Sequence, residues 1–416
     1  MKRDYNRMQK EALDNRIRMK MNEGNGTLYS EKERKRFSMT DQGKRCMMLC
    51  IFMVAALILS ILLVADVTEQ NYSIAFTAKY AITRMRDLVD LLSGNKPESQ
   101  IHYFMFQFFS AVLAGVALSV AGVCFQGVFQ NPMASPTMLG VQSGGTLGGT
   151  VYVMFFYTPM LSTILAAGSA NAYELYAAEY HSMSLFQKFG QYFFTLGGCI
   201  VVVFIVMLMA KIAGRGRIST VPLMVGGTIF SSCVANIVNL LQYYLSATGA
   251  NDTITETVQS LQSGTFEPIW VPFLLISFMV TALVPLIFAM AGTNKLNVLT
   301  FGEEEARAMG ISVRNTRVYY VIVSTLLTAS VIAFVGNINF VGLIVPHFAR
   351  MVVGNDFKYL VPASAFMGGI FMLLAWDVSY MIGFAVNTGM IVSMAGSAIF
   401  MVFMIRYRRQ GHADWA

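Results

Sequence analysis

The sequence predicts an all-α polytopic membrane protein with about ten transmembrane helices. Hydrophobic residues make up 55% of its 416 residues and charged residues only 13%, about half of the roughly 25% usual in soluble proteins. Several apolar runs reach the roughly 20 residues with which a helix crosses a bilayer. A transmembrane β-barrel would instead alternate apolar and polar residues over segments of about 10 residues.

Ten apolar segments follow one another along the chain. The eighth is shorter than a full crossing requires. Long outer loops, at about 66–103 and 158–191, follow the first and third segments. The expected segments are 46–65, 104–128, 137–157, 192–211, 220–245, 270–291, 317–336, 340–353, 360–381 and 389–406.

Basic residues predict the orientation of the chain. Residues 1–45 hold 13 Lys or Arg and 7 Asp or Glu, a net +6 of the formal net charge of +7. Lys and Arg accumulate on the cytoplasmic side of membrane helices, and further basic groups follow segments four, six and ten. We therefore expect a basic cytoplasmic tail at 1–45 and a transmembrane domain at 46–410, with both termini in the cytoplasm of a cell-membrane protein. Binding of nucleic acid is the weaker use of such a tail, because acidic residues interrupt it.

No constellation typical of an enzyme is present. The four histidines and five cysteines are scattered, without an H-E-x-x-H or C-x-x-C pattern, so no metal site is expected. A nucleotide site needs the loop G-x-x-x-x-G-K-[ST], whose amides and lysine hold the phosphates, and the sequence lacks it. We therefore expect a chain that is not an enzyme and binds no cofactor, and ATP that drives it would be hydrolysed by another chain.

The break between segments two and three reads FQNPMASPTMLGVQSGGTLGG. Pro132 lacks an N–H and disfavours helix at Asn131, Asn131 and Ser135 can hydrogen-bond freed backbone groups, and Pro136 suits the first turn of the next helix. These features predict a tight turn on the cytoplasmic side, which touches a partner, forms a gate, or only holds the helices in place. The candidates in this region are Gln126, Asn131, Pro132, Pro136 and Gly140.

Small and polar residues inside the apolar segments are candidates for a transport pathway or for helix packing. Glycines at G-x-x-x-G spacing let membrane helices approach closely. Uncharged amides can line a water-filled path or hydrogen-bond between helices. The candidates are Gly144, Gly145, Gly148, Asn236 and Asn239.

One acidic residue lies inside an apolar segment. Asp377, in LLAWDVSY near the outer end of segment nine, is by default a functional hypothesis, because charge in a membrane is costly. The alternative is a carboxylate that snorkels or caps a neighbouring helix.

The loop at about 293–316, TNKLNVLTFGEEEARAMGISVRNT, predicts a short amphipathic helix. Ala306 and Met309 are expected on one side, and Glu303 and Glu304 on another. Such a helix lies on lipid or docks into a groove of a soluble partner. Three adjacent glutamates disfavour an anionic membrane surface, so we expect a protein partner. Glycines Gly302 and Gly310 bracket the helix.

Three blocks of this chain resemble the FecCD-type permeases of ABC importers for iron chelates and cobalamin. The first is GVALSVAGVCFQGVFQNPMASPTMLGVQSGGTLG, the second is LNVLTFGEEEARAMGISV, and the third is GNINFVGLIVPHFARMVVGNDFKYLVPASAFMG. They lie in the family's order, and the resemblance that they carry runs from about the second segment to the C-terminus, roughly three quarters of the chain. In the second block the matched positions are Gly302, Glu303, Glu304, Ala306 and Gly310, and in the third the family's P-H-x-x-R corresponds to Pro346, His347 and Arg350.

The resemblance implies the permease of a type II ABC importer that moves a ferric siderophore, haem or cobalamin by alternating access. It implies pairing with a second permease copy or paralogue, two ATPase subunits that dock on the loop at 293–316, and an extracytoplasmic solute-binding protein. The chain lacks the family's arginines at outer positions, and Arg84, Arg86 or the enlarged outer loops are expected to take their place. An ion-coupled secondary transporter, a non-iron substrate in the same family and a membrane scaffold without transport remain as alternatives.

Overall fold

The structure is a computed structural model that describes residues 41–63, 100–157, 185–213, 220–247, 272–382 and 388–409. Every regular element in these ranges is a helix, so the all-α prediction is confirmed there. Residues 1–40 and most of the two long outer loops lie outside the described residues. The cytoplasmic tail and these loops therefore stay predictions.

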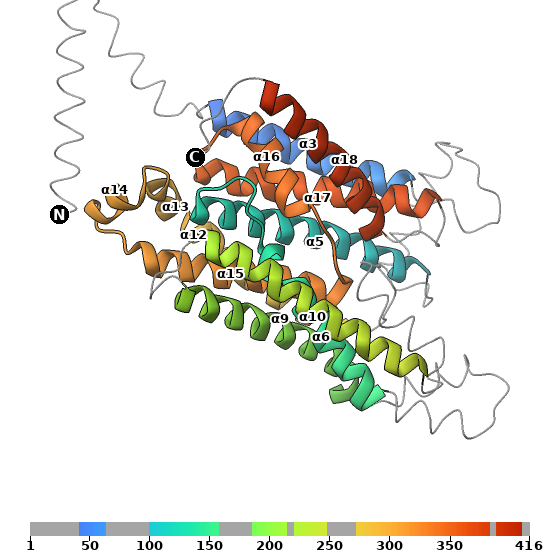
Figure 1. Ribbon diagram of the computed structural model, residues 1–416. Helices are drawn as coiled ribbons and strands as arrows, with labels where there is room; N and C mark the ends of the chain where they lie inside the picture. The colour runs from blue at the N-terminus through green and yellow to red at the C-terminus, as the bar shows by residue number, and fades with distance from the viewer. Residues whose placement is uncertain are drawn as a thin grey trace, which may run out of the picture. The chain divides into compact units, whose positions relative to one another are not determined.

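Ten helical segments lie in the order that the apolar runs predict (Figure 1). Four short elements join them: η2 (Pro136–Leu139), η3 (Val153–Tyr157), α13 (Thr293–Leu299) and α14 (Glu303–Ala308). The long helices are α3 (Asp41–Leu63), α5 (Gln100–Phe129), α6 (Val141–Tyr152), α9 (Leu185–Ala213), α10 (Thr220–Ala247), α12 (Pro272–Ala291), α15 (Val313–Val335), α16 (Val341–Val353), α17 (Phe357–Ile382) and α18 (Thr388–Arg409).

Some predicted boundaries are wrong by several residues. Helices α5 and α9 begin at Gln100 and Leu185, before the predicted loop ends at 103 and 191, because isolated polar residues at the end of an apolar run stay helical. Helix α15 begins at Val313 instead of 317, since Ser312 caps it. In the third segment, Gly140, with φ +80°, separates η2 from α6, and α6 continues directly into η3.

Five of the described helices are long and apolar enough to cross a membrane by length and composition. They lie in α5, α9, α10, α15 and α17, and α12 with α13 makes a sixth if this pair, bent by 53°, is one span. The bend falls at Gly292, where an added Cβ would lie 2.2 Å from the Tyr320 hydroxyl oxygen. Helix α16 is apolar but has only 13 residues, as the short eighth segment predicts.

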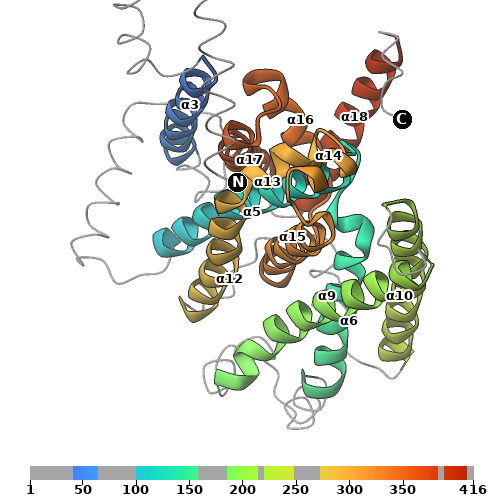
Figure 2. The same ribbon diagram turned by 90° about the vertical axis from the view of Figure 1, so that its left-hand side faces the viewer.

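Helix α5 lies at the centre of the unit, beside α15, α16 and α17 (Figures 1 and 2). Small residues make this packing close, as expected where lipid offers no hydrophobic drive for helix association. A Cβ on Gly115 would lie 2.1 Å from the carbonyl oxygen of Gly368 in α17, and one on Gly122 would lie 1.8 Å from that of Gly342 in α16.

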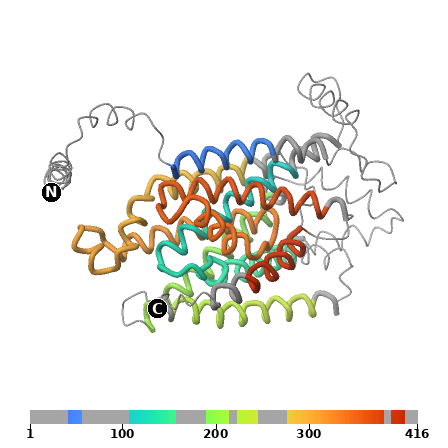
Figure 3. Tube along the Cα trace, turned by 90° about the horizontal axis from the view of Figure 1, so that it is seen from above, coloured from blue at the N-terminus to red at the C-terminus, as the bar shows by residue number. Residues whose placement is uncertain are grey.

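A second group of helices consists of α6, α9 and α10 (Figure 2). Helix α6 crosses α9 where Gly144 and Gly148 face Gly198, and a Cβ on Gly148 would lie 2.0 Å from the Phe194 carbonyl oxygen. Helices α10 and α18 lie along the same side of the unit, away from α12 (Figures 2 and 3).

Candidate functional site

The predicted docking helix is α14, which lies with α13 at one end of the unit (Figure 1). Gly302 and Gly310, at its two ends, have φ of +111° and +80°, a conformation that L side chains rarely adopt. Ala306 is fully buried and anchors the helix. Met309 follows Ala308, the last residue of α14, and is 49% exposed.

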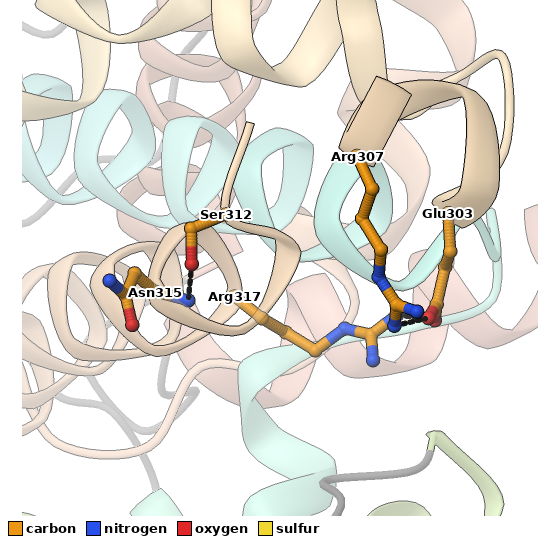
Figure 4. A network of polar contacts seen from close by, with 5 residues as sticks. All are labelled: Glu303, Arg307, Ser312, Asn315 and Arg317. Atoms are coloured by element: carbon orange, nitrogen blue, oxygen red, sulfur yellow. Dashed lines mark hydrogen bonds and ion pairs between the residues drawn. The ribbon is translucent and has the colours of Figure 1, made fainter. Parts of the chain in front are cut away.

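Glu303 forms two ion pairs (Figure 4). Its Oε2 lies 3.2 Å from Nη2 of Arg307 in the same helix, and its Oε1 lies 2.6 Å from Nη2 of Arg317 in α15. Glu303 therefore ties α14 to α15, and its side chain is 41% exposed. Glu304 and Glu305 are exposed.

Side-chain hydrogen bonds hold α13 against α17 and α5. The Asn297 amide donates to Oδ1 of Asp356 at 2.8 Å and accepts from the backbone N–H of Phe357 at 2.8 Å. Gln130, after α5, donates through its side-chain amide to the Leu299 carbonyl oxygen. Sequence reasoning missed these residues, since each pair lies far apart along the chain.

The surface of this loop combines exposed apolar and acidic side chains. Phe301 is 66% exposed and Met309 is 49% exposed, next to the carboxylates of Glu304 and Glu305. A rigid loop that holds large apolar side chains in solvent is typical of a surface that a protein partner covers.

The turn after α5 has the hydrogen bonds that its sequence predicts. The Asn131 side-chain oxygen accepts from the Met133 N–H at 2.9 Å, and the Ser135 hydroxyl accepts from the Thr137 N–H at 3.4 Å and caps η2. Pro132 lies in the turn, and Pro136 takes the first position of η2. The bond from Gln130 to Leu299 places this turn beside α13.

Two predicted residues from separate blocks meet inside the unit. Arg350 in α16 donates through Nη1 to Oε1 of Gln126 in α5, and Gln126 is 2% exposed. The Gln126 amide also donates to the carbonyl oxygen of Leu343 at 3.3 Å. Pro346 is buried within α16 and His347 is half-buried.

The link between α15 and α16 is not helical, and α6 supports it. Gln142 donates to Oδ1 of Asn339 at 2.8 Å, and Thr146 accepts from the Asn337 amide at 3.2 Å. Irregular backbone at membrane depth is found where protein or a water-filled cavity surrounds it. The Gln142 side chain therefore links α6 to the segment between α15 and α16.

Five exposed polar residues of α10 form one stripe. At 100° per residue they fall within an arc of about 80°, in which the exposed Val225 also lies. They are Thr228, Ser232, Asn236, Asn239 and Tyr243. An adjacent exposed stripe is mostly apolar, with Ile229, Ile237, Leu240 and Tyr244. Only 22% of the apolar window of α10 is buried.

The remaining candidates lie in packed positions. Gly144, Gly145 and Gly148 are buried, and a Cβ on Gly145 would lie 2.7 Å from the Ile332 side chain, so their position is that of packing glycines. Asp377 is 4% exposed and is therefore enclosed by the protein. Within the described ranges, no group of three or more His, Cys, Asp or Glu could hold a metal ion.

Comparison with known proteins agrees with the resemblance. Residues 53–406 match the sequence model of the FecCD transport family. The uncharacterized ABC transporter permease protein YvrB of Bacillus subtilis is 29% identical over 320 residues, which are 73% of this chain and 77% of that protein. The hemin transport system permease protein HmuU of Yersinia pestis is 27% identical over 72% of this chain and 81% of its own length. The molybdate import system permease protein MolB of Haemophilus influenzae is 27% identical over 73% and 79%.

A solved structure shares the fold. It is described as an inward-facing conformation of an ABC transporter assigned to the metal-chelate type, and it matches with a TM-score of 0.65 and 22% sequence identity. The match covers 88% of this chain and 99% of that chain.

Proposed function

The chain belongs to the FecCD transport family, and on that premise we propose that it is the membrane permease of an ABC importer. Its proposed substrate is an iron chelate, either a ferric siderophore or haem, or cobalamin. Relatives named for hemin, for iron(3+)-hydroxamate and for cobalamin support this substrate class. The proposed location is the cell membrane, with both termini in the cytoplasm.

The observation that carries the proposal is the polar stripe of α10. In hydrocarbon a polar group without a hydrogen-bonding partner costs several kcal/mol, so a stripe that includes Asn236 and Asn239 fits water or protein better than lipid. A passage along this side of the unit provides water. Helix α18, which exposes Met390 and Met394, lies on the same side of the unit as α10 (Figure 3).

A second permease copy or paralogue is the proposed partner on this side. It would close the passage, and substrate would cross by alternating access as the two states exchange. A solute-binding protein would deliver the substrate from outside. The residues that would replace the family's outer arginines, Arg84 and Arg86, lie outside the described residues.

The energy would come from two ATPase subunits that dock on the loop at 293–316. The exposed Phe301 and Met309, which lie just before and just after α14, support this role. The matching groove on the ATPase would be apolar with a basic rim, opposite Glu304 and Glu305. The permease itself would bind no nucleotide.

A non-iron substrate in the same family is the second candidate, because one relative is named for molybdate import. Co-reconstitution of the chain with its ATPase and binding protein in vesicles distinguishes the two. We expect ATP-dependent uptake of one of the ferric siderophores, hemin or cobalamin. ATP-dependent uptake of molybdate, without uptake of any of these chelates, would contradict the proposed substrate class. The proposal that the chain is an importer permease would still stand.

A further inference from the structure

Arg317, near the start of α15, contacts two other elements. Its Nη2 lies 2.6 Å from Oε1 of Glu303 in α14, and its side chain is only 13% exposed. Its guanidinium lies 5.8 Å from the ring centroid of Phe129, the last residue of α5. Arginine suits such a position, since its planar group pairs with a carboxylate and stacks on an aromatic face at the same time.

The end of α5 also holds α13. Gln130 has a positive φ of 49° and donates to the carbonyl oxygen of Leu299, the last residue of α13. The next residue, Asn131, begins the turn that leads through η2 to α6, and α6 packs against α10. A chain of direct contacts therefore connects α14, Arg317, the end of α5 and the helix next to the polar stripe.

The Glu303–Arg317 pair is an ion pair that joins α14 to α15. Ala306 is the one buried residue of α14, and an alanine side chain contributes little burial. The intrahelical pair of Glu303 with Arg307 does not restrain α14 as a body, because both residues belong to it. Backbone hydrogen bonds from Gly302 to Leu299 and from Ile311 to Ala306 close the turns at the two ends of α14, and the Glu303–Arg317 pair adds a side-chain attachment to α15.

We propose that Arg317 is a positioning residue that locks α14 to the end of α5, so that displacement of α14 by a docked partner moves the turn at 130–135 and α6. This inference rests on the proposed function, since it requires a partner on α14. A loosely attached α14 would absorb the displacement, whereas packed elements joined by an ion pair whose arginine is largely buried move together.

The first test compares Arg317→Gln with Arg307→Gln in the full chain, reconstituted with its ATPase and binding protein. Both variants remove one cation from Glu303, but only the first detaches α14 from α15. Arg317→Gln should retain the ATPase on co-purification and lower uptake per ATP hydrolysed by about tenfold, within the range of 5- to 150-fold usual for coupling between sites. Arg307→Gln should stay within about twofold of the unmodified chain, as expected of an exposed pair.

The conservative variant Arg317→Lys keeps a cation for Glu303 and for the Phe129 ring, and should retain more uptake per ATP than Arg317→Gln, an order that a change that only harms folding would not produce. Equal coupling in Arg317→Gln and Arg307→Gln would overturn the proposal. The proposal would also be overturned if Arg317→Gln reduced ATPase co-purification by the same factor as uptake per ATP hydrolysed. Arg317 would then only shape the docking surface.

A second test needs no ATPase and uses backbone hydrogen exchange of the full chain in lipid nanodiscs. Arg317→Gln should speed exchange both in 301–311 and in 129–135, while Arg307→Gln should affect 301–311 alone. An unchanged rate of hydrogen exchange in 129–135 would contradict the proposal that Arg317 locks α14 to the end of α5. A chain that binds no ATPase would refute the proposed function, and the exchange pattern would still decide whether Arg317 joins these elements.

Discussion

Gln126 and Arg350, 224 residues apart in the sequence, meet inside the protein, where the Arg350 guanidinium donates to the Gln126 side-chain oxygen. The same amide donates to the Leu343 carbonyl oxygen at 3.3 Å. One buried glutamine thus satisfies a cation and a backbone acceptor on α16 and fixes this short helix against α5.

Replacement of Gln126 by Leu should lower the stability of the fold. The change leaves the Arg350 donor without this acceptor, and an unsatisfied buried polar group costs about 1–3 kcal/mol. Thermal unfolding of the purified protein in detergent measures the effect. Gln126→Glu keeps an acceptor for Arg350 and is expected to retain more stability than Gln126→Leu, and the reverse order would contradict the role of this contact.

Gly122→Ala should be strongly destabilising. The added Cβ would lie 1.8 Å from the Gly342 carbonyl oxygen, so α5 and α16 would have to separate, and such overpacking costs about 1–3 kcal/mol. The matched control is Gly197→Ala, where nothing lies within 4 Å of the added Cβ. Alanine in an open helical position gains up to about 1 kcal/mol over glycine. Equal unfolding temperatures of the two variants would show that the α5–α16 crossing is not this close.

The polar stripe of α10 should be accessible to water. In a Cys233→Ser background, Asn236→Cys and Asn239→Cys should react with a water-soluble, membrane-impermeant thiol reagent in reconstituted vesicles. Ile237→Cys lies on the adjacent apolar stripe and should react at least about tenfold more slowly, because thiolate formation is suppressed in apolar surroundings. Similar rates at all three positions would show that the stripe does not line an aqueous passage.

The docking surface should depend on Phe301. Phe301→Ala should reduce co-purification of the ATPase by about tenfold or more, since a buried aromatic anchor at an interface often contributes 2 kcal/mol or more. Asn294→Ala, an exposed change in α13, should leave it unaffected. Glu304→Lys tests the acidic contribution, whereas Glu303→Lys would also break the pair with Arg317 and cannot isolate docking. Full retention of the ATPase by Phe301→Ala would place the interface elsewhere.

Local chemistry was predictable from sequence, and long-range partners were not. The apolar runs gave the helices, and Pro132, Ser135 and Pro136 predicted the turn after α5, because these signals act within a few residues. The bonds of Gln130 with Leu299 and of Asn297 with Asp356 join residues 169 and 59 positions apart, which no helical periodicity can pair.

In the loop at 293–316, too, local features were predictable from the sequence and contacts with other helices were not. Its position, its bracketing glycines and the burial of Ala306 followed from the sequence pattern. The side on which Met309 lies did not, because α14 ends one residue before it. Nor did the role of Glu303, since its partner Arg317 belongs to the next helix.

The most direct test of the account measures what drives transport in vesicles that contain the chain, its ATPase and its binding protein. We predict that radiolabelled iron, supplied as a ferric siderophore or as hemin, or else labelled cobalamin, accumulates only when ATP is present on the side of the ATPase. Accumulation of these substrates by the chain alone, driven by a proton or sodium gradient without ATP, would contradict the account and identify an ion-coupled transporter.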